Sequence, residues 1–145
     1  MGGYDMTPNW VNAITDNRLF QILARIVLTT PFWAAFFEHG IGFGAWTGTM
    51  AHFNLNPPLF FAIFTLLTLL VGTITVVFTD KWAWVGAALL GGFTVLTIPI
   101  AHAFWTMKEP QAHTEFYTVL EHIAIVGGLM VMSIWAGNRA KGSAA

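Results

Sequence analysis

The chain has 145 residues, of which 56% are hydrophobic and only 9% are charged. Typical soluble domains contain about 25% charged residues, so this composition excludes a water-soluble globular domain and a disordered chain. The net charge of −1 leaves no positive patch for a nucleic acid, and the absence of cysteine excludes disulfides, thiol catalysis and Cys-ligated metal clusters. We expect one membrane domain, residues 1–145, in contact with the lipid bilayer.

Four stretches are long and apolar enough to cross a bilayer, which takes about 20 residues per helix. In chain order they are residues 19–41, 59–78, 82–105 and 117–137. The middle two contain no Asp, Glu, Lys or Arg, whereas the outer two contain a few ionisable residues. The sequence therefore predicts an all-α fold, an integral membrane four-helix bundle.

The connection between the first two spans, residues 42–58, combines Gly, Asn and Pro with Trp46, Met50 and Phe53. So many apolar side chains would be unfavourable in water. We expect a re-entrant or interfacial segment that packs on the bundle.

Basic residues predict the orientation of the bundle. Arg18, Lys81, Arg139 and Lys141 lie at one end of the predicted spans, and only Lys108 lies at the other. The positive-inside rule then predicts that both termini are cytoplasmic, as in a protein of the bacterial inner membrane.

Two further features concern helix packing. Arg25 lies about 20 Å along its helix from Glu38, so we expect it to reach headgroups or to pair with Asp16 or Asp80. The Gly91-Gly92 and Gly127-Gly128 pairs predict close helix crossings.

The remaining ionisable residues within the spans share one depth. Glu38 and His39 end the first span, His102 lies near the end of the third, and Glu121 and His122 lie near the start of the fourth. A charge at the bilayer centre costs about 2.5–3.5 kcal/mol on insertion scales, and such residues commonly serve a function. We call these five residues the His/Glu cluster and predict that it is the functional site. The alternative is that its members only pair with one another or with headgroups.

One chemistry that suits the cluster is quinone binding. Imidazole can donate a hydrogen bond to a quinone carbonyl, and histidine and glutamate can carry the protons of its reduction. Trp33, Phe36, Phe37 and Trp105 would supply an aromatic slot for the ring, with Phe32 and Phe104 close by.

A metal centre is the other chemistry. Imidazole and carboxylate ligands suit haem or a non-haem metal. Adjacent residues on a helix, however, point about 100° apart, which makes it difficult for both members of the Glu38-His39 or Glu121-His122 pair to face one ion. The Glu-x-x-His spacing of di-iron bundles is also absent.

Three stretches of the sequence are informative as a set, namely residues 23–42 with Asn56-Pro57-Pro58, His102-Ala103-Phe104-Trp105, and residues 121–129, which end in Gly-Gly-Leu. Together they resemble the DoxX family of small four-helix membrane proteins. Members of this family are similar to membrane subunits of quinone-linked oxidoreductases, including thiosulfate:quinone oxidoreductase. The resemblance implies a subunit of a quinone-linked redox system, with quinone as cofactor and other membrane subunits as partners.

Two rival functions are open. The chain can be a non-catalytic assembly or packing subunit of a larger membrane complex, or a haem- or metal-binding membrane protein. A small transporter is disfavoured, because the sequence lacks the repeated broken-helix pattern of such folds.

Overall fold

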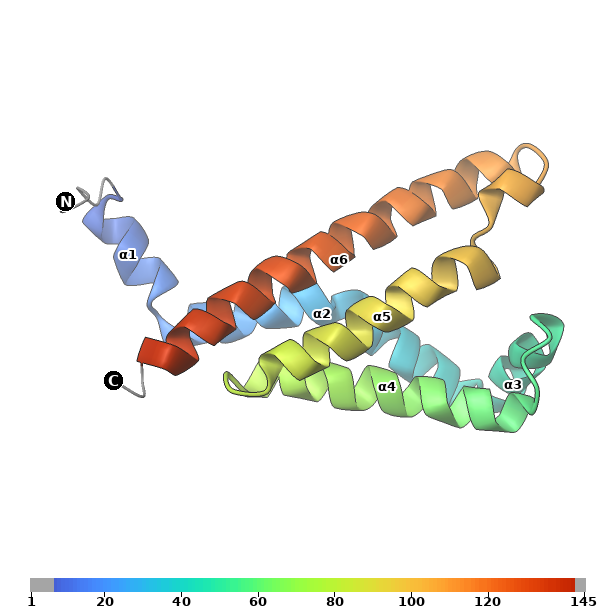
Figure 1. Cartoon of the computed structure of the whole chain (residues 1–145), viewed down its shortest axis with the longest axis horizontal. Coiled ribbons are helices and arrows are strands. Elements are labelled where there is room, and N and C mark those ends of the chain that lie inside the picture. Colours follow the sequence, from blue (N-terminus) through green and yellow to red (C-terminus); the bar gives the residue numbers. More distant parts are fainter. Residues whose placement is uncertain (1–6, 143–145) are drawn as a thin grey trace.

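The computed structural model describes residues 7–142, in which every regular element is a helix (Figure 1). The elements are α1 (Asn9–Thr15), α2 (Arg18–Ile41), α3 (Phe43–His52), α4 (Pro58–Phe78), α5 (Ala83–Ala101), the 3-10 turn η1 (Phe104–Thr106) and α6 (Gln111–Gly142). Four helical segments, namely α2, α4, α5 with η1, and α6, are long and apolar enough to cross a membrane. The predicted all-α, four-helix membrane fold is confirmed.

Local sequence explains where the spanning helices begin and end. The side chain of Asn17 caps α2 by accepting hydrogen bonds from the amides of Leu19 and Phe20. α4 starts at Pro58, where the missing amide proton costs nothing. α5 ends earlier than the predicted span, because Pro99 removes a hydrogen bond from its last turn. The chain breaks at His102 before η1 begins.

The four spanning helices are arranged as an open ring. α2 packs on α4, α4 on α5 and α5 on α6, whereas the contact of α6 with α2, which would close the ring, is small. Figure 1 shows α6 and α4 diverging towards the end at which α3 lies. We call the end with α1, the α4–α5 turn and the C-terminal part of α6 the N-terminal end, and the other the histidine end.

The Gly/Pro-rich connection contains a helix that the sequence did not predict. α3 packs on α4 and, over a smaller area, on α2. Ten residues of helix are about 15 Å long, too short to cross a bilayer. The segment therefore lies against the bundle at the histidine end, and its depth in the bilayer stays a prediction.

α4 shows which side chains of an apolar helix face the protein and which face the lipid. Its buried face carries mainly small or β-branched residues, whereas large side chains such as Phe60, Phe64 and Leu67 are exposed. Small residues at helix interfaces let backbones approach closely in a membrane, where lipid already solvates large apolar groups.

α4 and α5 approach each other closely where Gly72 of α4 faces Gly86 of α5. A Cβ atom on Gly86 would lie 2.6 Å from the carbonyl oxygen of Gly72. Among the glycines expected at crossings, a Cβ on Gly128 would lie 2.8 Å from a methyl group of Leu28, whereas Gly92 has open space. The adjacent glycine pairs in the sequence did not predict the contact between Gly72 and Gly86, because these two glycines come from different helices.

Arg25 is the most buried charge of the bundle, with 2% of its side chain exposed. It pairs with Asp80, one of the two partners expected, and its Nη1 donates to the carbonyl oxygens of Thr79 at 2.7 Å and Val76 at 3.2 Å. Arg18 also pairs with Asp80, at 3.0 Å. Partial burial would raise the pKa of the Asp80 carboxyl, but the hydrogen bonds and charges of both arginines outweigh burial and hold this pKa below its ordinary 3.8.

Candidate functional site

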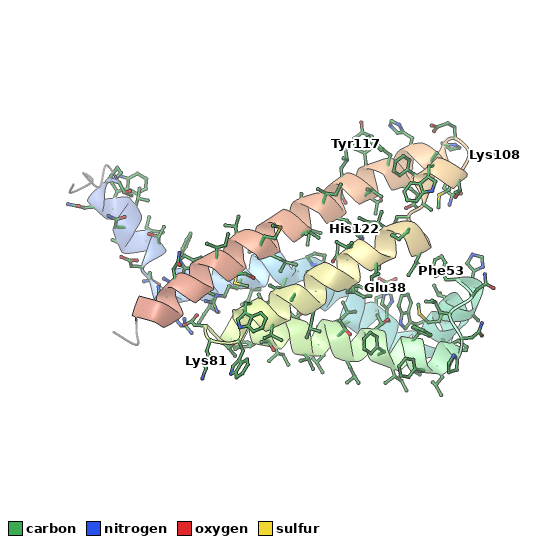
Figure 2. The ribbon with its side chains drawn as sticks, in the orientation of Figure 1. Glu38, Phe53, Lys81, Lys108, Tyr117 and His122 are labelled. Atoms are coloured by element: carbon green, nitrogen blue, oxygen red, sulfur yellow. The ribbon has the colours of Figure 1, made fainter. Side chains whose placement is uncertain are left out.

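Histidines from three helical regions meet at one cavity. His39 of α2, His102 just after α5 and His122 of α6 line a hollow of about 330 Å³, which we call the histidine cavity. Trp46 and Phe53 of the α3 segment close another side of it. Figure 2 shows His122, Glu38 and Phe53 at the end of the bundle opposite Lys81.

Two of these histidines are held next to each other. The His102 and His122 ring centroids are 4.8 Å apart, and His102 Nδ1 lies 2.7 Å from a carboxylate oxygen of Glu115. His122 Nδ1 lies 2.8 Å from the Thr118 carbonyl oxygen, which can only accept a hydrogen bond. The Nδ1 atoms of both rings therefore carry protons, which leaves Nε2 of each for a ligand.

His39 is positioned by an aromatic stack. Its ring lies parallel to the indole of Trp46, with centroids 3.6 Å apart and planes 3° from parallel. The buried indole N–H of Trp46 has no hydrogen-bond partner. A buried donor without a partner is costly, and an acceptor in the cavity would satisfy it.

The two glutamates of the His/Glu cluster lie outside the cavity wall. Glu38 and Glu121 are exposed, and each neighbours a cavity histidine in sequence. The 100° turn between adjacent helix positions separates them from the cavity, as it does for any such pair. Among the described residues, the carboxylate within hydrogen-bonding distance of a cavity histidine is that of Glu115, which lies against His102.

Sequence reasoning missed Glu115 because the fourth span was expected to begin at residue 117. α6 begins six residues earlier, at Gln111. With the helix extended, Glu115, Thr118 and His122 lie three, four and seven positions apart and share one face. That spacing is the signal that would have revealed the carboxylate.

None of the four aromatic residues expected to form the ring slot lines the histidine cavity. Trp33 and Phe36 both pack on Phe37 along α2, and Trp105 is 59% exposed and contacts Phe104. Phe32, which was expected close by, does line the histidine cavity. Its other aromatic walls are Trp46, Phe53 and Phe93.

The aromatic wall continues into a second, smaller cavity of about 150 Å³. Trp46, Phe53 and Phe93 line both hollows, and the lining of the smaller one is almost wholly apolar. The two hollows together offer hydrogen-bonding groups at one side and an aromatic slot at the other.

A metal centre receives no support from the side-chain geometry. Within residues 7–142, no group of three or more His, Asp or Glu side chains could hold a metal ion. We assign no metal to the cavity.

Comparison with known families accounts for much of this architecture. The model of the DoxX family matches residues 20–103, more than half of the chain. The chain belongs to the DoxX family. The matched stretch runs from α2 to the residue after His102, so it includes His39 and His102 but not Glu115 or His122. This DoxX protein matches no curated protein and no solved structure.

Proposed function

We propose that this DoxX protein is the quinone-binding subunit of a membrane redox system and that the histidine cavity is its quinone site. The observation that carries the proposal is the meeting of His39, His102 and His122 at one hollow with aromatic walls. A quinone combines an apolar ring with two carbonyl oxygens, and this pairing of surfaces matches it.

The polar side of the cavity suits the exchange of protons with the ring oxygens. Reduction of a quinone to a quinol takes two electrons and two protons. Nε2 of His102 donates to a carbonyl oxygen when the ring is charged and accepts from a quinol hydroxyl when it is neutral. Glu115 at 2.7 Å stabilises the charged ring, so it serves as the carboxylate partner of His102.

His122 supplies a second proton position. Two imidazolium rings 4.8 Å apart would repel each other, so we expect only one of the two rings to carry a second proton, and hence a positive charge, at a time. The Trp46 indole N–H, which has no partner, would donate to the second ring oxygen. In this proposal the electrons come from a partner subunit of the redox system.

Quinone binding to the purified protein tests the proposal. Trp46 lines the cavity, so a short-chain ubiquinone analogue should quench its fluorescence on binding. We expect His102→Ala and His122→Ala each to weaken binding about tenfold, the worth of a lost hydrogen bond in an apolar site. Both substitutions should also abolish quinone-dependent electron transfer in membranes.

His113→Ala is the matched control. His113 is an exposed histidine of α6 at the same end of the bundle, where its ring contacts Tyr117 outside the cavity. This variant should bind the analogue as the wild type does. Unchanged binding and electron transfer in both cavity variants would overturn the quinone assignment and favour the rival role, a non-catalytic assembly subunit.

A further inference from the structure

A second site lies between α2 and α6 on the side of the N-terminal end. A groove of about 310 Å³ runs between these helices, below the end of α1. Ala24 and Leu28 of α2 and Met132 and Trp135 of α6 line its apolar walls. It shares no lining residue with the histidine cavity, so it is independent of the proposed quinone site.

The floor of this groove holds two buried polar side chains with unmet hydrogen bonds. Gln21 and Arg25 are 4% and 2% exposed and lie one helical turn apart. Gln21 Nε2 donates to the Thr15 carbonyl oxygen at 2.7 Å, yet its Oε1 has no partner. Arg25 Nε also has none, although both its Nη atoms are bonded.

Buried polar groups without partners are rare in native proteins, and each calls for an explanation. Here the unmet pair is one donor and one acceptor on the same helix face. A hydroxyl group can both accept from Arg25 Nε and donate to Gln21 Oε1. The terminal torsion of a glutamine is soft, so the amide of Gln21 can turn towards such a group.

Charge at this end favours an anionic ligand. The guanidinium groups of Arg25 and Arg139 lie 4.9 and 5.2 Å from the centroid of the Trp135 ring, and Arg18 is close by on Asp80. Asp80 and the exposed Asp16 supply two negative charges against the three positive charges of these arginines, so one positive charge is left without a counter-charge.

We propose that the groove binds an anionic phospholipid whose headgroup carries free hydroxyls, as phosphatidylglycerol does. A glycerol hydroxyl bonds Gln21 and Arg25, the phosphate lies among the arginines, and one acyl chain follows the apolar walls between α2 and α6. The occupant is a lipid because the groove opens on the lipid-facing side of two spanning helices, where Val131 is 68% exposed.

The chain offers a matched control groove. A hollow of about 430 Å³ between α5 and α6 is lined by Trp84, Ala88, Gly92 and Ser133 among others. It is larger, but it contains none of the unpartnered buried polar atoms of the described chain. Lipid should therefore bind there without headgroup preference.

Native mass spectrometry of the detergent-solubilised protein with added lipid tests the site. We expect phosphatidylglycerol to bind about tenfold more tightly than phosphatidylcholine, which has no hydroxyl and no net charge. Gln21→Leu, which removes the acceptor, and Ala24→Phe, which fills the groove from an exposed position, should both abolish the preference. Ala88→Phe, the equivalent change in the control groove, should leave it intact.

Two other lipids distinguish the contribution of the charge from the contribution of the hydroxyl groups. Phosphatidic acid supplies charge without glycerol hydroxyls, and diacylglycerol supplies a hydroxyl without charge, so each should bind less tightly than phosphatidylglycerol. Equal binding of either one would overturn the proposal, as would equal binding of phosphatidylcholine. Glycerol phosphate should not displace the lipid, and displacement would reassign the site to a soluble compound. If Gln21→Leu fails to fold, Ala24→Phe against Ala88→Phe still decides the matter.

Discussion

At the scale of single residues, Glu115 separates the structure from the sequence-based interpretation. The sequence-based interpretation assigns the proton carrier to Glu38 or Glu121, whereas in the structure Glu115 is the carboxylate within hydrogen-bonding distance of His102. Glu115→Gln keeps a hydrogen-bond acceptor but removes the charge that stabilises a protonated His102. We expect quinone-dependent electron transfer to fall about 100-fold, the usual scale of lost acid–base catalysis, with little change in quinone binding.

Glu121→Gln is the comparison for this prediction. Its carboxylate is exposed and lies outside the cavity wall, so electron transfer should change much less. An equal fall in both variants would return Glu121 to the proton path, and a fall in quinone affinity alone would make Glu115 a structural residue.

The stability of the N-terminal end depends on Asp80. Asp80→Asn leaves Arg25 buried without a counter-charge, a loss of about 3–5 kcal/mol when both partners are fully buried. Because the Asp80 side chain is 32% exposed, we expect about 2 kcal/mol. Thermal unfolding in detergent, followed by circular dichroism, measures this change, and Asp16→Asn, at an exposed acid of the same end, should have little effect.

The same residue gives a pH dependence of known sign. The pKa of Asp80 in the folded protein lies below 3.8, the value expected for the unfolded chain. Its contribution to the stability of the folded state is therefore complete above pH 3.8 and is lost as the pH falls through the folded pKa. The difference in unfolding temperature between wild type and Asp80→Asn should therefore shrink in acid. A difference that stays constant or grows below pH 3.8 would contradict the ion-pair account.

At the scale of helices, the α4–α5 contact depends on a single missing side chain. A Cβ on Gly86 would lie 2.6 Å from a backbone oxygen of Gly72, and backbone cannot rotate away as a side chain can. We expect Gly86→Ala to destabilise the bundle by about 1–3 kcal/mol, as overpacking does. Unfolding in detergent measures the loss.

Gly92→Ala is the control on the same helix. A Cβ there meets nothing within 4 Å, and alanine favours a helix over glycine by about 1 kcal/mol. This variant should be as stable as the wild type or more so. If both substitutions have the same effect, close approach of α4 and α5 is not what requires Gly86.

Helices also mark the limit of what the sequence predicts. Apolar length predicts four spans because each helix must satisfy its own backbone in lipid, and the four long helices follow these spans closely. It does not predict α3, whose ten residues are too few to give a membrane signal. Nor does it predict the break at His102, where the loss of one hydrogen bond at Pro99 outweighs apolar continuity.

At the scale of the whole molecule, the depth of each residue in the membrane could be predicted from the sequence, whereas the direction in which its side chain points from the helix could not. Position along a helix follows from residue number, so the common level of His39, His102 and His122 is visible in sequence. Which side chains turn inward depends on how four nearly uniform apolar helices pack. For that reason Phe32, Trp46 and Phe93 line the cavity, whereas Trp33 and Phe37 pack on each other.

Orientation in the membrane is a property of the whole chain, and the absence of cysteine makes it measurable. Ala13 of α1 and Gln111 at the start of α6 are exposed and lie at opposite ends of the bundle. The positive-inside rule predicts that Ala13 faces the cytoplasm. A membrane-impermeant maleimide added to intact cells should therefore label Gln111→Cys and not Ala13→Cys, and both should react once the membrane is permeabilised. Neither substitution changes the charges that set the topology, so labelling of Ala13→Cys alone in intact cells would reverse the orientation and place the histidine cavity on the cytoplasmic side.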